Sequence, residues 1–340
     1  MDSDQQGDLM NFISLFSGIG GFDYGFIRAG WNCIGYCELD KFAHKAFEIL
    51  HDPKGLIPNE YDVRSVSDGF IRTVRNAGSI DAIVAGFPCQ TFSIAGKRQG
   101  FKDTTRGTLF FEIARIAEIA KPRYLILENV KGLLNHGGGN TYQIILESLD
   151  ELGYDCEWQV LNSKNFGVAQ NRERVFIVGY LRGSSRTKVF PIIRENDATI
   201  EVVGMLNVKG KDQIRRVYST NHLSPCLSTM QGGGQEPKVF LSVNQHEVKE
   251  QEFAHCLDAN YFKGLLANQS RTGVLEKYKI RKLTPLECFR LQSYPDEWYF
   301  TLKEHGFSDT QLYKLAGNGV TSNVAYEIAR RLIDGADSCN

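Results

Sequence analysis

The sequence predicts an α/β protein built on a doubly wound, mostly parallel sheet, with a second, smaller β-rich domain. Over the first 180 residues, strand-like and helix-like segments alternate, which is typical of a parallel sheet with crossover helices. From Arg182 this rhythm stops, and residues 182–281 contain short β-branched runs broken by Gly232-Gly-Gly234 and by prolines. We therefore expect a first domain at 1–181, a second at 182–281, and a return to the first domain at 282–340.

The expected elements follow from the sequence in order. Short apolar runs predict strands at residues 12–16, 33–37, 80–85, 124–127 and 174–180. Between them, helices are expected at residues 22–29, 41–50, 108–120 and 142–152. Beyond the second domain we expect a helix at 285–292, a loop at 316–320 and an amphipathic helix at 322–333. The last helix should pack on the first domain.

The composition is that of a globular enzyme, with 42% hydrophobic and 23% charged residues. The polar, acidic start and the lack of a run of about 18 apolar residues predict a cytoplasmic protein with no signal peptide and no membrane partner. Eight cysteines form no Cys-x-x-Cys pair and have no neighbouring histidine pairs, so we expect no metal.

The net charge of −1 conceals an uneven distribution. Residues 182–281 hold 15 Lys and Arg against 10 Asp and Glu, a local charge of +5, and the rest of the chain carries −6. A loop at 97–106 adds a local +3 through Lys97, Arg98, Lys102 and Arg106, offset by one Asp. A basic loop and a basic domain are the electrostatic pattern expected for contact with a phosphate backbone.

Cys89 directly follows a predicted strand. The apolar run 81–86 leads into Phe87-Pro88-Cys89-Gln90, which places the thiol at the carboxyl edge of the sheet, where open α/β folds bind ligands. A buried cysteine that acts as a small hydrophobic residue is the alternative. The basic loop that follows favours a nucleophile.

A glycine-rich turn, Phe16-Ser-Gly-Ile-Gly-Gly21, joins the first strand to the first helix. Such a turn lets a ligand approach the backbone and the helix N-terminus. Glu38, at the end of the next strand, is placed to accept hydrogen bonds from ribose hydroxyls. A nicotinamide cofactor is the alternative, but the third glycine of the pyrophosphate-binding pattern is missing. An adenosyl ligand without pyrophosphate fits better, and we expect S-adenosylmethionine.

Further polar side chains are expected at the same edge of the sheet. One strand leads into Glu128-Asn129-Val130, which puts a carboxylate beside Cys89. Arg172 and Arg174 alternate at the entry to the following strand, so both should point to one side. A surface ion pair or a helix cap would explain each alone. Their convergence with Cys89 favours a functional site.

With these residues in place, the chain resembles the DNA (cytosine-5) methyltransferases of bacterial or phage type, nearly end to end outside residues 182–281. The motifs that carry the resemblance are, in order, Phe16–Gly21, Gly86–Gln90, Arg106–Phe110, Glu128–Val130, Gln170–Arg174, Arg281–Gln292 and Gly317–Val320. The resemblance implies the S-adenosylmethionine-dependent methyltransferase fold. It also implies that the cofactor is surrounded by Phe16, Gly18, Gly20, Glu38, Asp62, Leu109, Asn318 and Val320.

The resemblance implies a covalent mechanism. C5 of cytosine is too weak a nucleophile to take a methyl group from a sulfonium, so a nucleophile must first add at C6. The Cys89 thiolate would add there, Glu128 would share a proton with N3, and Arg174 would hold O2. Asn129 would fix the loop that carries Glu128, and Arg172 belongs to the same catalytic group. The target base must be flipped out of the duplex to be reached.

Residues 182–281 correspond to the target recognition domain of this family, and double-stranded DNA is the implied partner. The expected DNA contacts are Lys97, Arg98, Lys102, Arg106, Arg215, Arg216, Gln231, Asn260 and Lys263. Family members often carry Thr-Leu in this domain, whereas this chain has Cys226-Leu227 and Cys256-Leu257. Which loop reads the bases therefore stays open.

Two other functions stay open as well. A tRNA cytosine methyltransferase would use the same scaffold, although its relatives usually show Pro-Pro-Cys-Gln where this chain has Phe87-Pro-Cys-Gln. A DNA-binding regulator could keep the fold and lose turnover, but the intact Cys89, Glu128 and Arg174 argue against it. We expect a monomer, with a cognate restriction endonuclease as a potential partner in the same host.

Overall fold

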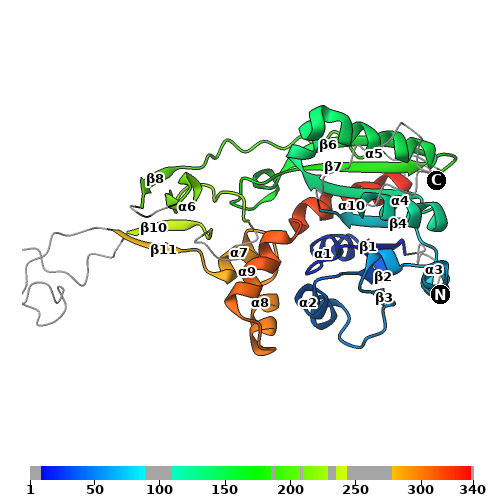
Figure 1. Ribbon diagram of the computed structural model, residues 1–340, viewed down its shortest axis with the longest axis horizontal. Coiled ribbons are helices and arrows are strands. Elements are labelled where there is room, and N and C mark those ends of the chain that lie inside the picture. The colour runs from blue at the N-terminus through cyan, green and yellow to red at the C-terminus, as the bar shows by residue number, and fades with distance from the viewer. Residues whose placement is uncertain are drawn as a thin grey trace, which may run out of the picture.

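The structure, a computed structural model, describes residues 9–88, 109–184, 188–206, 208, 210–228, 235–242 and 278–337. Figure 1 shows a large α/β body that contains both described ends of the chain, and a small sheet at the opposite end of the molecule. Helices α7, α8 and α9 lie between them. Among the described residues, no helix is long and apolar enough to cross a membrane.

The large sheet has seven described strands in the order β3-β2-β1-β4-β5-β7-β6. These strands are β1 (Asn11–Leu15), β2 (Asn32–Cys37), β3 (Asn59–Glu60), β4 (Ala82–Gly86), β5 (Tyr124–Val130), β6 (Tyr154–Asn162) and β7 (Glu173–Leu181). The first five in the sheet are parallel, and β7 runs antiparallel to both β5 and β6. The predicted doubly wound, mostly parallel sheet is confirmed.

Helices cover both faces of this sheet. In chain order, all the described helices are α1 (Gly21–Arg28), α2 (Lys41–His51), α3 (Asp68–Ala77), α4 (Leu109–Ala120), α5 (Asn140–Glu151), α6 (Asp212–Arg215), α7 (Pro285–Arg290), α8 (Asp296–Glu304), α9 (Asp309–Asn318) and α10 (Ser322–Asp337). Of these, α6 belongs to the second region, and α7, α8 and α9 lie between the two sheets. Short 3-10 turns lie at Val63–Ser65, Lys131–Gly139 and Ser163–Phe166. Val74 of α3, Ile113 of α4 and Ile145 of α5 are fully buried in one cluster. Phe26 of α1 and Ile328 of α10 are buried in a separate cluster on the other face.

The last helix, α10, packs on α1 of the large body. Gly25 of α1 lies so close to α10 that an added Cβ would stand 2.6 Å from the Ala325 Cβ. The Trp31 indole donates a hydrogen bond of 3.2 Å to the carbonyl of Ala329. The final segment of the chain is therefore part of the first core.

Several elements depart from the sequence-based expectation. The predicted loop at 316–320 is in part the end of α9, which a capping box between Ser308 and Gln311 starts. Helices α3 and α8 and strands β3 and β6 were not expected. β6 is an edge strand with charged residues at Asp155 and Glu157, so it lacks the apolar run that signals a buried strand.

The second region forms a separate sheet in the order β11-β10-β9-β8. Its strands are β8 (Val202–Met205), β9 (Arg216–Ser219), β10 (Lys238–Ser242) and β11 (Tyr278–Lys282). β9 and β10 are parallel, and the other neighbours are antiparallel. The prediction of β-rich structure here agrees with this sheet.

The start of this region differs from the predicted boundary at residue 182. Val189, Phe190 and Ile192 are buried with the first core. Gln159 of β6 bonds the backbone of Ile192 through both its amide nitrogen (2.9 Å) and its amide oxygen (2.8 Å). This stretch is therefore attached to the large body, and the small sheet begins only at Val202.

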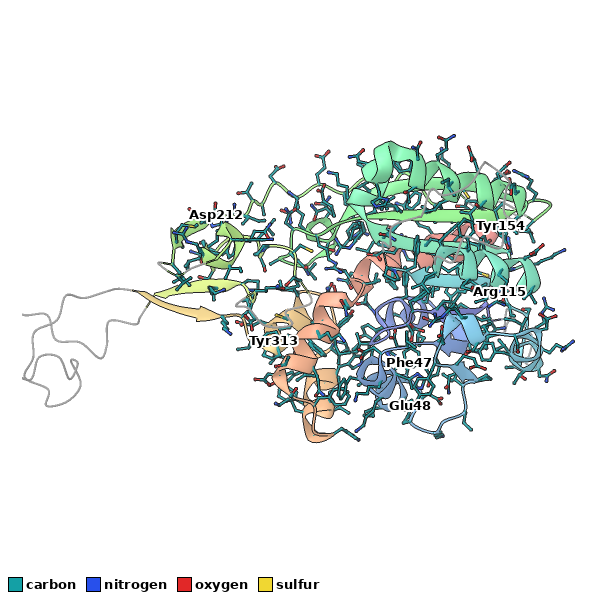
Figure 2. The ribbon with its side chains drawn as sticks, viewed as in Figure 1. Phe47, Glu48, Arg115, Tyr154, Asp212 and Tyr313 are labelled. Atoms are coloured by element: carbon teal, nitrogen blue, oxygen red, sulfur yellow. The ribbon has the colours of Figure 1, made fainter. Side chains whose placement is uncertain are left out.

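An apolar cluster joins the small sheet to the large body. It combines Leu227 and Val239 of the second region with Phe289 and Leu312 of α7 and α9, and with Ala46 of α2. Figure 2 shows α9, marked by Tyr313, close to the base of β10 and β11, and Asp212 at the outer end of the small sheet. The α7–α9 segment thus anchors the small sheet beside the edge of the large one.

Candidate functional site

A cavity of about 1020 Å³ opens at the carboxyl edge of the large sheet. Its walls come from the ends of β1, β2, β4 and β5, from the start of α4, from the end of α9 and from residues 227–228 of the second region. Ten of the residues predicted for catalysis or cofactor binding line it: Phe16, Gly18, Glu38, Asp62, Leu109, Glu128, Asn129, Arg172, Arg174 and Asn318. Residues from seven separate segments therefore meet in one cavity, of a size typical of small-molecule sites.

The glycine-rich turn forms one end of the cavity. Phe16 and Gly18 have φ angles of 55° and 59°, in the left-handed region that glycine tolerates best. The Glu38 carboxylate accepts a 2.8 Å hydrogen bond from the Gly18 amide and a 2.7 Å bond from the Asp40 amide. Burial raises the pKa of this carboxyl, while these two amide donors oppose the rise. Glu38 thus links the turn after β1 to the end of β2.

Two residues predicted to surround the cofactor, Gly20 and Val320, are not among the residues that line the cavity. Gly20 faces His51, because an added Cβ would stand 2.1 Å from the imidazole Nε2. Val320 packs against the turn, because a Cβ added to Gly21 would stand 2.4 Å from the Val320 carbonyl oxygen. Their assignment to the cofactor site stays a prediction, and the contacts described here show only that both help to shape the turn.

Asp62 lines the cavity but is already engaged. Its carboxylate forms a bidentate pair with the Arg64 guanidinium, with a shortest contact of 2.6 Å. It also caps the short turn at Val63–Ser65 through the Arg64 amide. The hydrogen bonds from Arg64 hold the pKa of this carboxyl below its usual value.

Sequence reasoning missed four charged residues of the wall: Asp40, Lys41, Arg64 and Lys314. The Asp40 carboxylate accepts a 2.5 Å bond from the Lys314 ammonium. Burial acts to raise the pKa of Asp40, but the bond from Lys314 and the amides of α2 hold it below its usual value. No local pattern marked Lys314, because a loop was expected at 316–320 and no helix over Asp309–Asn318.

Glu128 occupies the opposite end of the cavity, at the end of β5. It pairs in register with Gly86 of β4, where an added Cβ would stand 3.4 Å from the Glu128 Oε2. Its side chain is only 10% exposed and forms an ion pair of 3.0 Å with the Arg174 guanidinium. Burial raises the pKa of Glu128, while Arg174 and then Arg172 oppose the rise. A buried carboxyl with a raised pKa can hold a proton closer to neutrality than an exposed one.

Asn129 connects this strand to the chain that leads to Cys89. Its amide donates 2.9 Å to the carbonyl of Phe87, and its oxygen accepts from the Val130 amide at 2.8 Å. The side chain was expected to fix the loop carrying Glu128. It also holds the loop after β4, whose last described residue, Pro88, lines the cavity.

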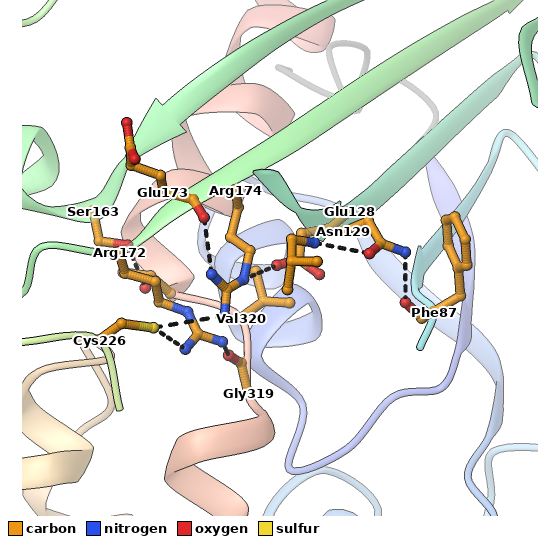
Figure 3. A network of polar contacts seen from close by, with 12 residues as sticks. Phe87, Glu128, Asn129, Ser163, Arg172, Glu173, Arg174, Cys226, Gly319 and Val320 are labelled. Carbon is orange, nitrogen blue, oxygen red and sulfur yellow. Dashed lines mark hydrogen bonds and ion pairs between the residues drawn. The ribbon is translucent and has the colours of Figure 1, made fainter. Parts of the chain in front are cut away.

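The two arginines lie on one side, as expected, and have different partners (Figure 3). Arg172 is buried, and its guanidinium donates to the carbonyls of Gly319 (2.8 Å), Gly317 and Leu227 (3.3 Å each). Arg174 donates to the carbonyl of Glu173 at 2.8 Å and pairs with Glu128. Arg172 therefore binds the second region and the end of α9, while Arg174 orients the carboxylate.

Cys226 was not predicted as part of this site. Its sulfur lies 3.4 Å from Nη1 of Arg172 and 3.7 Å from Nη2 of Arg174. The Cys226-Leu227 pair therefore adjoins the site. The second such pair, Cys256-Leu257, lies outside the described residues.

Several predicted residues also lie outside the described part of the chain: Cys89, Lys97, Arg98, Lys102, Arg106, Gln231, Asn260 and Lys263. The two remaining DNA-contact candidates differ from each other. Arg215 donates to the carbonyl of Leu206 at 3.2 Å and lies 3.7 Å from Asp212. Arg216 instead lines a second cavity of about 390 Å³, together with Lys211, Tyr218 and Cys226. Of the two, only Arg216 lines this second cavity.

A doubly wound sheet with a glycine-rich turn, an acidic residue ending the second strand and a buried Glu–Arg pair in the same cavity defines a nucleoside-cofactor enzyme of the methyltransferase fold. The model of the C-5 cytosine-specific DNA methylases matches residues 10–334, and the chain belongs to this family.

Two relatives and one solved structure illustrate the similarity. The type II methyltransferase M.Bsp6I of Bacillus sp. (strain RFL6) is 35% identical, with 95% of this chain and 98% of the relative covered. The orphan methyltransferase M.SPRI of Bacillus phage SPR is 30% identical, with 95% and 97% covered. A crystal structure of a Spodoptera frugiperda DNMT2 mutant has a TM-score of 0.63 at 17% identity and covers 95% of this chain and 99% of that one, which supports the fold. Membership of the family makes the protein a cytosine C5 methyltransferase, and this fold and family use S-adenosylmethionine.

Proposed function

We propose that the protein transfers a methyl group from S-adenosylmethionine to C5 of a flipped-out cytosine in a specific double-stranded DNA sequence, through a covalent bond between Cys89 and C6. The observation that carries this proposal is the shared cavity. Glu38 and Gly18, suited to an adenosine, and Glu128 and Arg174, suited to a pyrimidine, open into the same space.

The residues at the glycine-rich end fit the cofactor. The Glu38 oxygens each accept one backbone amide and keep lone pairs for the ribose hydroxyls. Gly18 has no heavy atom within 4 Å of an added Cβ, so its bare backbone leaves room for a ligand. The proposed binding site also includes Phe16, Asp62, Leu109 and Asn318, which line the cavity, and Gly20 and Val320. S-adenosylmethionine supplies an electrophilic methyl group on a sulfonium.

The residues at the other end would act on the base. The Cys89 thiolate would add to C6, and Glu128 would share a proton with N3, which its raised pKa supports. Arg174 would hold O2 while keeping Glu128 in place through their 3.0 Å ion pair. Asn129 would position the chain leading to Cys89 through its bond to Phe87. After methyl transfer, a base would remove the C5 proton, and the electron pair released would re-form the C5–C6 double bond and expel the Cys89 thiolate.

The buried Arg172 would play a supporting part. Its bonds to the backbone at Leu227, Gly317 and Gly319 tie the second region and α9 to the catalytic edge. A chemical role at the base is less suited to it, because these carbonyls already engage its guanidinium. We therefore propose that Arg172 positions the site and that Arg174 contacts the base.

Residues 182–281 are proposed to select the DNA sequence. The small sheet carries Arg216 and Lys211 at a cavity whose residues include Cys226, and Cys226 contacts both active-site arginines. This proximity would bring a bound duplex to the cavity where its base is modified. One of the two relatives is named a type II methyltransferase and the other an orphan methyltransferase. The proposed function is therefore compatible with a restriction endonuclease partner and also with the lack of one.

Expression in a methylation-free bacterium, followed by base-resolution mapping of 5-methylcytosine, tests the proposal. We expect methylation at one short sequence with the wild-type protein and none with the Cys89→Ser variant. Purified protein should methylate DNA in preference to tRNA when both are offered, and DNA with 5-fluorocytosine at the target should trap it covalently. Methylation of tRNA alone, or normal turnover by Cys89→Ser, would contradict the substrate or the covalent step, respectively.

A further inference from the structure

The ion pair between Lys314 and Asp40 closes one wall of the cofactor cavity. The two residues are 274 positions apart in the chain, and their nitrogen and oxygen are 2.5 Å apart. Each side chain is about one third exposed, at 31% and 32%. Both line the cavity, so the pair lies at its wall and not on a remote surface.

Asp40 connects this pair to the residue proposed to bind the ribose. Its Oδ1 accepts from the amides of Phe42 and Ala43 at 3.0 Å each and so caps α2. Its own amide donates 2.7 Å to Glu38, whose other oxygen accepts from Gly18 at 2.8 Å. A continuous series of contacts therefore runs from Lys314 through Asp40 and Glu38 to the glycine-rich turn.

The other side of the pair is held by the catalytic end of the cavity. Lys314 is on α9, whose last turn receives hydrogen bonds from Arg172 at the Gly317 carbonyl and from Gln292 at the Ala316 carbonyl. Because α9 is fixed in this way, the ammonium is a fixed point for the Asp40 carboxylate. The pair thus joins the cofactor half of the cavity to its catalytic half.

We propose that Lys314 is a positioning residue for the cofactor, which acts by holding Asp40 so that the Glu38 carboxylate keeps its direction in the cavity. This proposal rests on the proposed function, because it assumes that S-adenosylmethionine occupies this end. Lys314 acts through Asp40, so its effect falls on cofactor affinity and not on the methyl-transfer step.

Calorimetric binding of S-adenosylmethionine to the full chain, together with steady-state kinetics, tests this role. We expect Lys314→Met to raise the Kd and the KM for S-adenosylmethionine about two- to fivefold, the scale of a partly exposed ion pair, with kcat nearly unchanged. Lys314→Arg should restore affinity. Lys303→Met is the matched control, since Lys303 forms a similar 3.0 Å pair with Asp309 at the other end of α9, away from the cavity.

A double-mutant cycle tests the route through Asp40. Asp40→Asn keeps a helix-capping side chain but removes the charge. We expect the double variant Asp40→Asn with Lys314→Met to have a Kd for S-adenosylmethionine no higher than that of the single variant that binds it more weakly. Additive losses, an unchanged Kd for Lys314→Met, or an equal loss in Lys303→Met would overturn the proposal. If the wild-type chain itself fails to bind S-adenosylmethionine, the proposed function fails as well, and the two failures are thereby distinguished.

Discussion

Adding a single methyl group at Gly20 is expected to destabilise the protein strongly, whereas the same change at Gly18 is not. Both residues have a left-handed backbone, with φ of 89° and 59°, which costs an alanine about 1–2 kcal/mol at each position. At Gly18 an added Cβ meets no atom within 4 Å. At Gly20 it would stand 2.1 Å from Nε2, 2.6 Å from Cδ2 and 2.9 Å from Cε1 of the His51 ring.

The His51 ring cannot move aside without loss. Its Nε2 bonds the carbonyl of Ile19 at 3.0 Å, and the ring packs against Phe47 and Trp298. Losing that bond costs about 1 kcal/mol, and repacking an overfilled core costs about 1–3 kcal/mol. With the backbone term, Gly20→Ala should lower the free energy of unfolding by about 3–6 kcal/mol, a large share of the total for a domain.

Urea denaturation followed by circular dichroism measures this difference. Gly18→Ala should lose only about 1–2 kcal/mol of stability while weakening S-adenosylmethionine binding, because Gly18 lines the cavity. Combining Gly20→Ala with His51→Ala should recover part of the loss, since the small side chain removes the clash. Equal stability of the Gly18→Ala and Gly20→Ala variants, or strictly additive effects of Gly20→Ala and His51→Ala, would refute this account of the turn.

Three further predictions follow from the described contacts. Glu38→Ala should weaken S-adenosylmethionine binding by about 1–3 kcal/mol, the scale of a charge-assisted hydrogen bond. Calorimetry measures this change. An unchanged Kd would mean that Glu38 only bonds the backbone amides of Gly18 and Asp40 and does not bind the cofactor. Burial raises the pKa of Asp23 from 3.8 to about 7, so the folded protein keeps a proton that the unfolded chain releases, and stability should fall as the pH rises from about 4 to 7. Asp23→Asn should reduce this dependence of the free energy of unfolding on pH, which urea titrations at several pH values measure. An unaltered pH dependence would mean that other groups cause it. Arg216→Ala should weaken DNA binding, measured by fluorescence anisotropy, and reduce the salt dependence of that binding. Arg215→Ala should have little effect, because the Arg215 guanidinium already donates to the carbonyl of Leu206. Equal effects of the two substitutions would contradict this distinction.

Much of the large sheet and the site could be predicted from the sequence, because both depend on local patterns. Central strands buried on two faces appear as apolar runs, and parallel strands bring their carboxyl ends to one edge. Glu128 and Arg174 could therefore be placed together, and the structure joins them at 3.0 Å. Strand β6 was not predicted because it lies at the edge of the sheet and pairs with a strand on one side only. Its sequence mixes apolar with polar and charged residues, so it contains no apolar run.

The rest depends on contacts between distant segments that leave no local signal. Gly20 and Val320 belong to the family motifs, yet the direction of the turn is set by His51 and by the packing of Val320 against Gly21. The pairing of Asp40 with Lys314 requires α9 to return to the first domain after the second sheet. The contact of Cys226 with both arginines likewise depends on how the second region docks.

The packing of α10 against α1 has a consequence for biosynthesis. The Trp31 indole finds its acceptor at Ala329, 298 residues later in the chain. At a translation rate of about 5–20 residues per second, roughly 15–60 seconds separate the synthesis of these two partners. Throughout that interval the apolar face of α1 on the nascent chain lacks its covering helix and is exposed to chaperones and to aggregation. Completion of the enzyme core must therefore follow, and cannot accompany, synthesis of the region proposed to choose its DNA sequence.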